Sequence, residues 1–194
     1  MLAAGESRRL GEPKALAPIG ERSGLEHLLA ASQSCQAALP LVVAGAHHDL
    51  IQAALPPGAE LCHNPDWSAG RTGSLQCAVR ARADLDLCVA PADVPLVPAE
   101  VFEALRAEWE RAGAPAHGWL APSHGTAPVR MGHPVVVGRA LAQKALELAP
   151  DAPLRGLRQS ARPLWSLAVP SAAILDDLDT PEDLARLRAR FGDG

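Results

Sequence analysis

The chain has 194 residues, a length that suits one domain able to bury a sizeable core. Its formal net charge of -4 excludes the strongly basic surface of proteins that bind nucleic acid or anionic membranes, so we expect a small-molecule partner. The sequence contains neither an apolar run long enough to span a membrane nor a signal-peptide pattern, and a cytoplasmic location is therefore expected.

Short apolar runs alternate with longer helical patterns through the first half of the chain. Strands are predicted at residues 39–44, 59–62 and 87–90, and helices at residues 24–34, 48–54 and 74–83. This alternation is typical of β-α-β units that form a mostly parallel sheet. Together with a composition rich in Ala, Leu and Val, it predicts a single-domain, Rossmann-like α/β fold with helices on both faces of the sheet.

The second half begins with an amphipathic helix, predicted at residues 99–112 after Pro98. Residues 114–138 are rich in Gly, Pro and His, and we expect a loop-rich, substrate-facing region that ends in a strand at 134–137. Thr180 is the expected N-cap of the final helix. The remaining predicted elements are a helix at 140–148, a strand at 164–169, a short strand ending at Leu175 and the final helix at 181–190.

The cysteines and histidines show no metal-binding pattern. The four cysteines form no C-x-x-C pair, and each falls in or beside an apolar segment, which predicts buried, reduced thiols. They are Cys35, Cys62, Cys77 and Cys88. The histidines expected to be structural or exposed, because they lack the ligand spacing of a zinc site, are His47, His48, His63, His117 and His124.

The front of the chain carries a Gly-rich turn with basic residues. Gly5 and Gly11 allow backbone conformations that other residues avoid, so successive N–H groups can point at an anion. Arg9 and Lys14 add positive charge to the same loop. A triphosphate-binding loop and an ordinary surface turn both fit this composition, and neither the Walker A nor the G-x-G-x-x-G pattern is present.

Two carboxylates are candidates for metal ligands. Asp93 follows the predicted strand at 87–90, and the carboxyl ends of strands are where open α/β sheets bind ligands. Asp177, at another predicted strand end, is the second candidate, and Mg²⁺ commonly takes one or two carboxylates besides phosphate oxygens and water. The alternatives are a turn-forming Asp before Pro95 and solvated charge near a helix start.

Residues 2–14, which read LAAGESRRLGEPK, closely resemble the signature of the MobA-like nucleotidyltransferases. This group includes the molybdenum cofactor cytidylyltransferases and guanylyltransferases, and Ala4 is more similar to the cytidylyltransferase branch. Four other segments resemble the same family in the same order, so the similarity spans nearly the whole chain. They are residues 64–76, 90–97, 131–135 and 177–184.

The resemblance implies an Mg²⁺-dependent enzyme that transfers a nucleoside monophosphate from an NTP, with CTP favoured, to a phosphorylated acceptor such as molybdopterin. It implies that Lys14 contacts the triphosphate, that Arg9 clamps the leaving pyrophosphate, that Asp179 is a further candidate metal ligand and that His133 contacts the acceptor. For Ser74 a plain helix N-cap is the alternative. The residues implied in nucleotide binding are Leu2, Ala3, Ala4, Gly5, Ser7, Asn64, Gly73 and Ser74.

On this interpretation, the nucleotide-binding part of the domain covers about 1–98 and the acceptor-binding part about 99–194.

The sequence departs from the family pattern in two places, the first strand and the segment expected to contact the acceptor. Family members usually carry several more apolar residues before the loop, so we expect either an upstream start or a first strand reduced to a stub. Residues 151–155 read DAPLR where cofactor cytidylyltransferases tend to show G-D-x-G-A-R, which bears on the acceptor and not on the nucleotide site.

A molybdopterin cytidylyltransferase is therefore the leading hypothesis. A transferase for a sugar phosphate or another small phosphorylated metabolite is the enzyme alternative. A non-catalytic nucleotide- or cofactor-binding chaperone, which delivers the cofactor to a target enzyme, is the alternative from a different class. The expected partners are the two small-molecule substrates and a molybdoenzyme or its chaperone, with no nucleic acid and no membrane.

Overall fold

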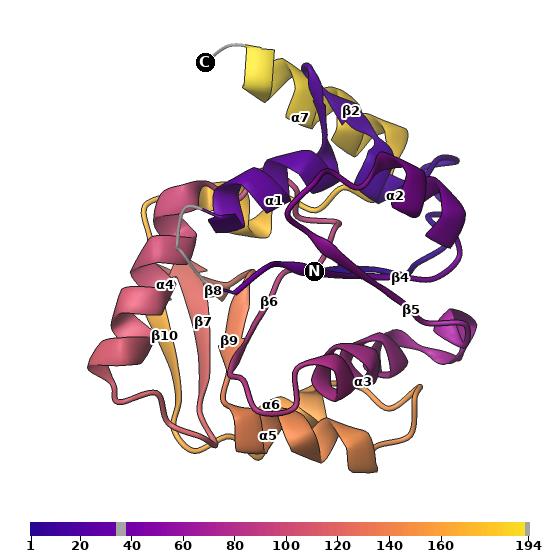
Figure 1. The fold of residues 1–194 in the computed structure, drawn as a ribbon. Helices are drawn as coiled ribbons and strands as arrows, with labels where there is room; N and C mark the ends of the chain where they lie inside the picture. Colours follow the sequence, from indigo (N-terminus) through magenta and orange to yellow (C-terminus); the bar gives the residue numbers. More distant parts are fainter. Residues whose placement is uncertain (34–37, 193–194) are drawn as a thin grey trace.

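Strands and helices alternate along the computed structural model, which describes residues 1–33 and 38–192 (Figure 1). The strands are β1 (Leu2–Ala3), β2 (Pro18–Ile19), β3 (Arg22–Ser23), β4 (Leu41–Ala44), β5 (Glu60–His63), β6 (Leu87–Val89), β7 (Trp119–His124), β8 (Arg130–Met131), β9 (Val135–Val137) and β10 (Leu164–Ala168). The α-helices are α1 (Gly24–Gln33), α2 (His48–Ala54), α3 (Arg71–Ala81), α4 (Ala99–Arg111), α5 (Arg139–Gln143), α6 (Arg155–Gln159) and α7 (Pro181–Gly192). Short 3₁₀ helices lie at Lys14–Leu16, Trp67–Ala69, Lys144–Glu147 and Ala172–Leu175.

Two sheets meet at the first strand. The first has the order β1-β4-β5 with all strands parallel, and the second has the order β10-β7-β9-β6, in which β9 runs antiparallel to both neighbours. Leu2 links the two sheets, because its N–H donates to the Ala90 carbonyl at 2.9 Å and its carbonyl accepts from the Ala92 N–H at 3.0 Å. The loop after Ala3 and the residues that follow β6, including Asp93, therefore emerge at the same edge.

Helices cover both faces of this arrangement. Successive side chains of a strand point to opposite faces, and β7 and β9 follow this rule. Trp119 and Val137 pack in a core with α3, α5 and α6, whereas Leu120 and Val136 pack in a core with α1 and α4. A further core joins α1 and α2 to β1 and β4. The predicted single-domain α/β fold with parallel strands is confirmed.

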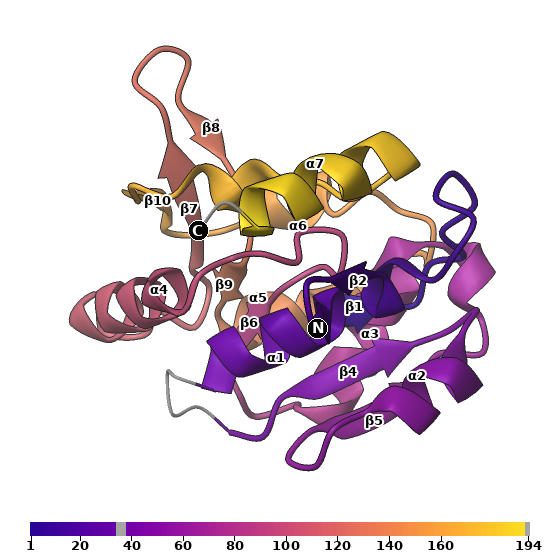
Figure 2. The ribbon, with the colours of Figure 1, turned by 90° about the horizontal axis from the view of Figure 1, so that it is seen from above.

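The last helix returns to the front of the chain. Leu184 and Leu187 of α7 pack against Ile19 of the β2–β3 hairpin, and Leu178 is fully buried in the same cluster. The Leu178 N–H donates to the Asp93 carbonyl at 2.7 Å. Figure 2 shows α7 lying over the β2 segment, while the β7–β8 hairpin projects away from the body of the protein. This packing brings the acidic segment before α7 to the N-terminal loop.

Most predicted elements are present with small shifts in their ends. The strands expected at 39–44, 59–62 and 87–90 correspond to β4, β5 and β6, and the helices expected at 48–54 and 99–112 correspond to α2 and α4. The helix expected at 140–148 is divided into α5 and the following 3₁₀ turn. Thr180 caps α7 as expected, because its Oγ1 accepts from the Asp183 N–H at 3.2 Å. β1 is a strand of two residues.

Three predictions of local structure are wrong. The loop-rich region expected at 114–138 contains the six-residue strand β7, in which Pro122 lacks an N–H but accepts from the Gly132 N–H at 2.9 Å. The strand expected to end at Leu175 is a 3₁₀ helix, since the Ser171 hydroxyl accepts from the Ala173 N–H and caps it. α3 begins at Arg71 rather than at Ser74, so Ser74 lies inside the helix and is not its N-cap.

The cysteines differ in part from the prediction. Cys62 and Cys77 are half-buried free thiols, whereas Cys88 is exposed and lines a cavity together with Met1 and Phe102. Burial raises the pKa of the half-buried Cys77 thiol. Cys35 lies outside the described residues. Among the helices of the described residues, none is both long enough and apolar enough to cross a bilayer.

Candidate active site

The N-terminal loop is held in one conformation by Ser7. Ser7 has φ of 58°, a left-handed backbone conformation that is uncommon for a residue with a side chain. Its hydroxyl accepts from the Lys14 N–H at 3.0 Å, and its carbonyl accepts from the N–H groups of Leu10 and Gly11, both at 3.1 Å. Gly11, with φ of 82°, supplies the second left-handed turn. The loop is therefore organised before any ligand binds.

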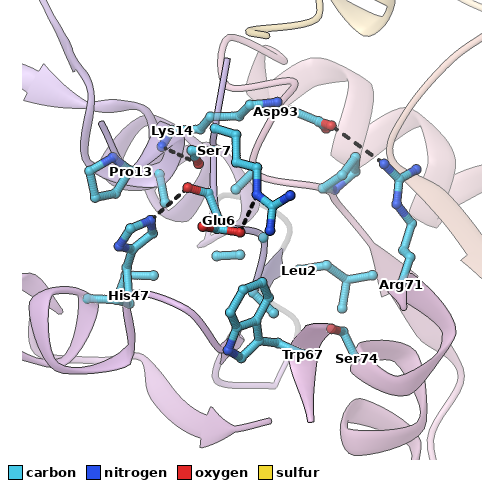
Figure 3. A pocket seen from close by; sticks show the side chains of 18 of the residues that line it. Leu2, Glu6, Ser7, Pro13, Lys14, His47, Trp67, Arg71, Ser74 and Asp93 are labelled. Carbon is cyan, nitrogen blue, oxygen red and sulfur yellow. Dashed lines mark hydrogen bonds and ion pairs between the residues drawn. The ribbon is translucent and has the colours of Figure 1, made fainter. Parts of the chain in front are cut away.

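A first pocket of about 440 Å³ opens where this loop, the end of β6 and the start of α3 meet (Figure 3). Its floor is formed by backbone and small side chains, which let a ligand approach the chain closely. Most of the residues predicted to bind a nucleotide line it. They are Leu2, Ala3, Ala4, Gly5, Ser7 and Ser74, together with the predicted triphosphate and metal residues Lys14 and Asp93.

Asn64 and Gly73, the other residues predicted to bind the nucleotide, do not line the first pocket. The Asn64 side-chain amide donates to the Ser74 hydroxyl at 3.0 Å, and both side chains are buried. Gly73 packs near Pro150, to whose carbonyl its N–H donates at 3.3 Å. Asn64 therefore orients the hydroxyl that Ser74 presents to the pocket.

Lys14 and Arg9 both form ion pairs with Asp179. The Lys14 ammonium and the Asp179 carboxylate are in direct contact, and Arg9 Nη2 lies 2.7 Å from Asp179 Oδ2. The hydrogen bond from Lys14 is the main reason that the pKa of Asp179 is lowered. The Arg9 side chain is 68% exposed and lies outside the first pocket, which is lined by its neighbour Arg8. One carboxylate thus pairs with both of the cations that the resemblance predicts to contact phosphate groups.

Asp177 lies close to Asp93 and to Asp179. Burial raises the pKa of Asp177, and the negative charges of Asp93 and Asp179 raise it further, while Lys14 opposes them. Clustered carboxylates of this kind suit a divalent cation, which relieves their repulsion. In residues 1–33 and 38–192, however, no three His, Cys, Asp or Glu side chains converge on one point as a complete metal site. The residues fit a cation that also takes oxygens from a ligand.

A second pocket of about 710 Å³ adjoins the first. The two pockets share Leu2, Arg71 and Pro91. The wall of the second pocket is largely apolar, and its charged residues besides Arg71 lie in or near α6. Its lining includes Trp119, His133, Val135, Val137, Asp151, Leu154, Arg155 and Arg158.

His133 stands in the second pocket, as expected for a residue that contacts an acceptor. Its Nδ1 is buried and has no hydrogen-bond partner among the described residues. Burial lowers the pKa of His133, with Asp93 raising it and Arg71 lowering it to a smaller extent. The imidazole is therefore neutral at pH 7 and lies within electrostatic reach of the junction between the pockets.

Comparison with known proteins identifies the family. The profile of the MobA-like NTP transferase domain matches residues 1–164. The chain belongs to this family. The NTP transferase is 24% identical to the molybdenum cofactor cytidylyltransferase of Escherichia coli over 192 residues, which cover 97% of this chain and 94% of that protein.

Two other similarities differ in extent. The NTP transferase is 37% identical to the bifunctional protein GlmU of a Bradyrhizobium species over 118 residues, which are 55% of this chain and only 25% of GlmU. Its fold matches that of Rv0371c from Mycobacterium tuberculosis, solved in complex with manganese, with a TM-score of 0.75 and 22% identity. The match covers 97% of this chain and 95% of that chain, and at this identity it shows the fold alone.

Sequence reasoning missed several lining residues of this NTP transferase. Arg8, His47, Trp67 and Arg71 line the first pocket. A signal existed for three of them, because Arg8 lies inside residues 2–14, and Trp67 and Arg71 lie inside residues 64–76, which both resemble the family. His47 carries no such signal; its Nε2 lies 3.0 Å from the Glu6 carbonyl, a contact that only the folding of β4 beside β1 creates.

Proposed function

We propose that this NTP transferase transfers a nucleoside monophosphate, with CTP as the favoured donor, to a phosphate monoester acceptor such as molybdopterin. The observation that carries the proposal is the junction of the two pockets at Leu2, Arg71 and Pro91, beside Asp93. A donor in the first pocket and an acceptor in the second would lie next to each other, on either side of these shared residues. Such positioning converts a reaction between two solutes into one within a single complex.

The reaction needs no proton transfer. An oxygen of the acceptor phosphate attacks the α-phosphorus of the NTP, a new P–O bond forms, and the bond from the α-phosphorus to the bridging oxygen breaks. Pyrophosphate leaves with that oxygen and its electron pair. The attacking phosphate is already ionised at neutral pH, so a neutral His133 near the junction is compatible with a role in hydrogen bonding and not in general base catalysis.

The N-terminal loop is suited to the triphosphate. Its small residues Ala3, Ala4 and Gly5 line the first pocket, so a phosphate can approach the backbone there. Lys14, whose side chain is 18% exposed, carries a charge that a phosphate can reach. Phosphate groups would displace Asp179 from Lys14, while Arg9 would contact the leaving pyrophosphate through its planar fork. Ser74, oriented by Asn64, is assigned to the base.

Asp93 and Asp177 would hold Mg²⁺, together with Asp179 if a phosphate took its place at Lys14. The bound cation would neutralise charge on the phosphate oxygens and on the leaving pyrophosphate. The repulsion that raises the pKa of Asp177 supports a cation at this place, and the manganese complex of Rv0371c supports a divalent metal in a protein of the same fold.

The choice of CTP and molybdopterin rests on three observations. Ala4 is similar to the cytidylyltransferase branch, His133 lines the second pocket, and the Escherichia coli cytidylyltransferase matches nearly the full chain. A second candidate acceptor, a sugar phosphate or another small phosphorylated metabolite, is favoured by the altered segment 151–155, because Asp151, Leu154 and Arg155 line the second pocket directly.

The test is a screen for pyrophosphate release with each NTP, Mg²⁺ and either molybdopterin or a series of sugar 1-phosphates. The proposal expects release with CTP and molybdopterin. A preference for GTP would reject the CTP assignment, and release with a sugar 1-phosphate alone would establish the second candidate. A protein that binds NTP but releases no pyrophosphate with any acceptor would instead be a nucleotide- or cofactor-binding chaperone.

A further inference from the structure

Arg71 lies at the boundary between the two pockets. In the described part of the chain it is the one charged residue that lines both of them. It is the first residue of α3, and its side chain is 68% exposed, so the guanidinium can turn toward either pocket. Figure 3 shows Arg71 next to Asp93 at the edge of the first pocket.

The only ion pair that Arg71 makes among the described residues is weak. Arg71 Nη2 lies 3.8 Å from Asp93 Oδ2, which is too long for a hydrogen bond. The guanidinium therefore has most of its donors available for a ligand. Arg155 and Arg158 also line the second pocket, but they come from α6 and do not line the first. They cannot reach across the junction as Arg71 does.

We propose that Arg71 binds the phosphate of the acceptor and holds it beside the α-phosphorus of the donor. The acceptor class is then a phosphate monoester whose body enters the second pocket while its phosphate points toward Asp93. This inference rests on the proposed function, which it deepens by assigning the residue that recognises the reacting group of the acceptor.

Electrostatics favour a cation at this point. A phosphate dianion that approaches a triphosphate is repelled by several kcal/mol at contact distance, even at an effective dielectric constant of about 20. Lys14 belongs to the loop on the donor side and contacts Asp179. Arg71 approaches from α3, on the side that opens into the second pocket, and its planar fork can donate two parallel hydrogen bonds to one phosphate.

The surroundings of Arg71 agree with this assignment. His133 is close enough for the charges of both Arg71 and Asp93 to act on it, so a phosphate at the junction also has a neutral imidazole nearby. Beyond it, Trp119, Val135 and Val137 offer an apolar wall to the body of the acceptor. The charged end and the apolar end of the second pocket thus match a molecule with one terminal phosphate.

The first experiment compares the steady-state kinetics of Arg71→Ala, Arg71→Lys and the wild type with CTP, Mg²⁺ and molybdopterin. Loss of a charge-assisted pair of hydrogen bonds predicts that Arg71→Ala raises the KM for molybdopterin by about 10- to 100-fold, with the KM for CTP changed by less than about twofold. Arg71→Lys should recover part of the loss, because it keeps the charge but not the fork. Arg80→Ala is the matched control, since Arg80 is exposed at the other end of α3 and lines neither of the two pockets.

A rise in the KM for CTP with no change for molybdopterin would overturn the inference, because Arg71 would then belong to the triphosphate. Unchanged constants for both substrates would overturn it as well.

A second experiment separates this inference from the proposed function. If the wild type releases no pyrophosphate, binding of inorganic phosphate to the protein loaded with a non-hydrolysable CTP analogue is measured by calorimetry. The inference expects that Arg71→Ala weakens phosphate binding by about tenfold or more while Arg80→Ala does not. Equal phosphate affinity in wild type and Arg71→Ala would overturn it whether or not the protein turns over.

Discussion

The two pockets of this protein are built in different ways. About half of the residues that line the first are neighbours in sequence, from Leu2 to Arg8 and from Pro13 to Ala15. The second is lined by residues of α3, β7, β9 and β10 and by residues between Asp151 and Gln159, and these segments lie far apart in the chain. A triphosphate is common to all NTPs and can be bound by backbone and a few charges, whereas an acceptor is recognised by a particular shape. Half of the proposed donor site is therefore set by neighbours along the backbone, whereas the proposed acceptor site depends more on tertiary packing.

The largest effect is expected where the two pockets meet. Asp93→Asn removes the charge assigned to the metal without a change in volume, and it should lower kcat by about 10³-fold for every pair of donor and acceptor. Pyrophosphate release measures the effect. Asp84→Asn, an exposed carboxylate in the turn before β6, is the control and should behave as wild type. Retention of most of the activity in Asp93→Asn would break the assignment of Asp93 to the junction.

A smaller effect, confined to the first pocket, is expected for Lys14→Ala. Loss of one preorganised cation should lower kcat/KM for the NTP by about 10²-fold and leave the KM for the acceptor unchanged. The exposed Lys144→Ala is the matched control. If the KM for the acceptor rose by as large a factor as kcat/KM for the NTP fell, Lys14 would act on both substrates and not on the NTP alone.

The converse variant is confined to the second pocket. Leu154 is half-buried in its wall, and Leu154→Glu places a carboxylate beside an anionic acceptor. We expect the KM for the acceptor to rise by about tenfold, with the KM for CTP unchanged. Leu154→Met, which keeps the volume and adds no charge, should stay near wild type. Leu146→Glu, which places the same charge at an exposed leucine outside the second pocket, is a second control. An equal loss in Leu154→Met would point to packing and not to charge.

The smallest effect concerns stability and pH. Burial, followed by Asp93 and Asp179, raises the pKa of Asp177. A raised folded-state pKa means that Asp177 contributes stability below the ordinary aspartate pKa and that this stability is lost as the pH rises through the raised value. Asp177→Asn should therefore raise the Tm of the metal-free protein by about 2 °C near neutral pH, since an exposed charge interacts weakly. The difference should vanish in acid. A lower Tm for the variant at neutral pH would show that contacts with cations such as Lys14 outweigh the repulsion.

The sequence predicted the elements of the fold correctly where local patterns are strong. Alternating apolar runs and helical periods predicted β4, β5, β6, α2 and α4. The same reasoning failed at β7, because Pro122 and the surrounding Gly and His residues resemble a loop, and the strand exists through its pairing with β10 and β9. It also failed before α7, where the Ser171 cap turns an apolar segment into a 3₁₀ helix.

The sequence also predicted part of the candidate site. The loop residues and Asp93 were predicted, and they line one pocket. Arg71 lies within a segment that resembles the family, but nothing in its local sequence tells that it borders a second pocket. The residues of that second pocket come from several elements that lie far apart in the chain, so they form no single sequence motif.

By itself, the sequence determined the chemistry available at the front of the chain: a glycine-rich loop with basic residues, and an aspartate at the end of a buried strand. These features depend on neighbours along the backbone. The tertiary structure alone decided that Lys14 contacts Asp179, 165 residues away, and that Arg71 stands between two pockets. The physical reason is that the burial of apolar side chains elsewhere, such as Leu178 before α7 and Leu187 within it, sets where these polar groups meet.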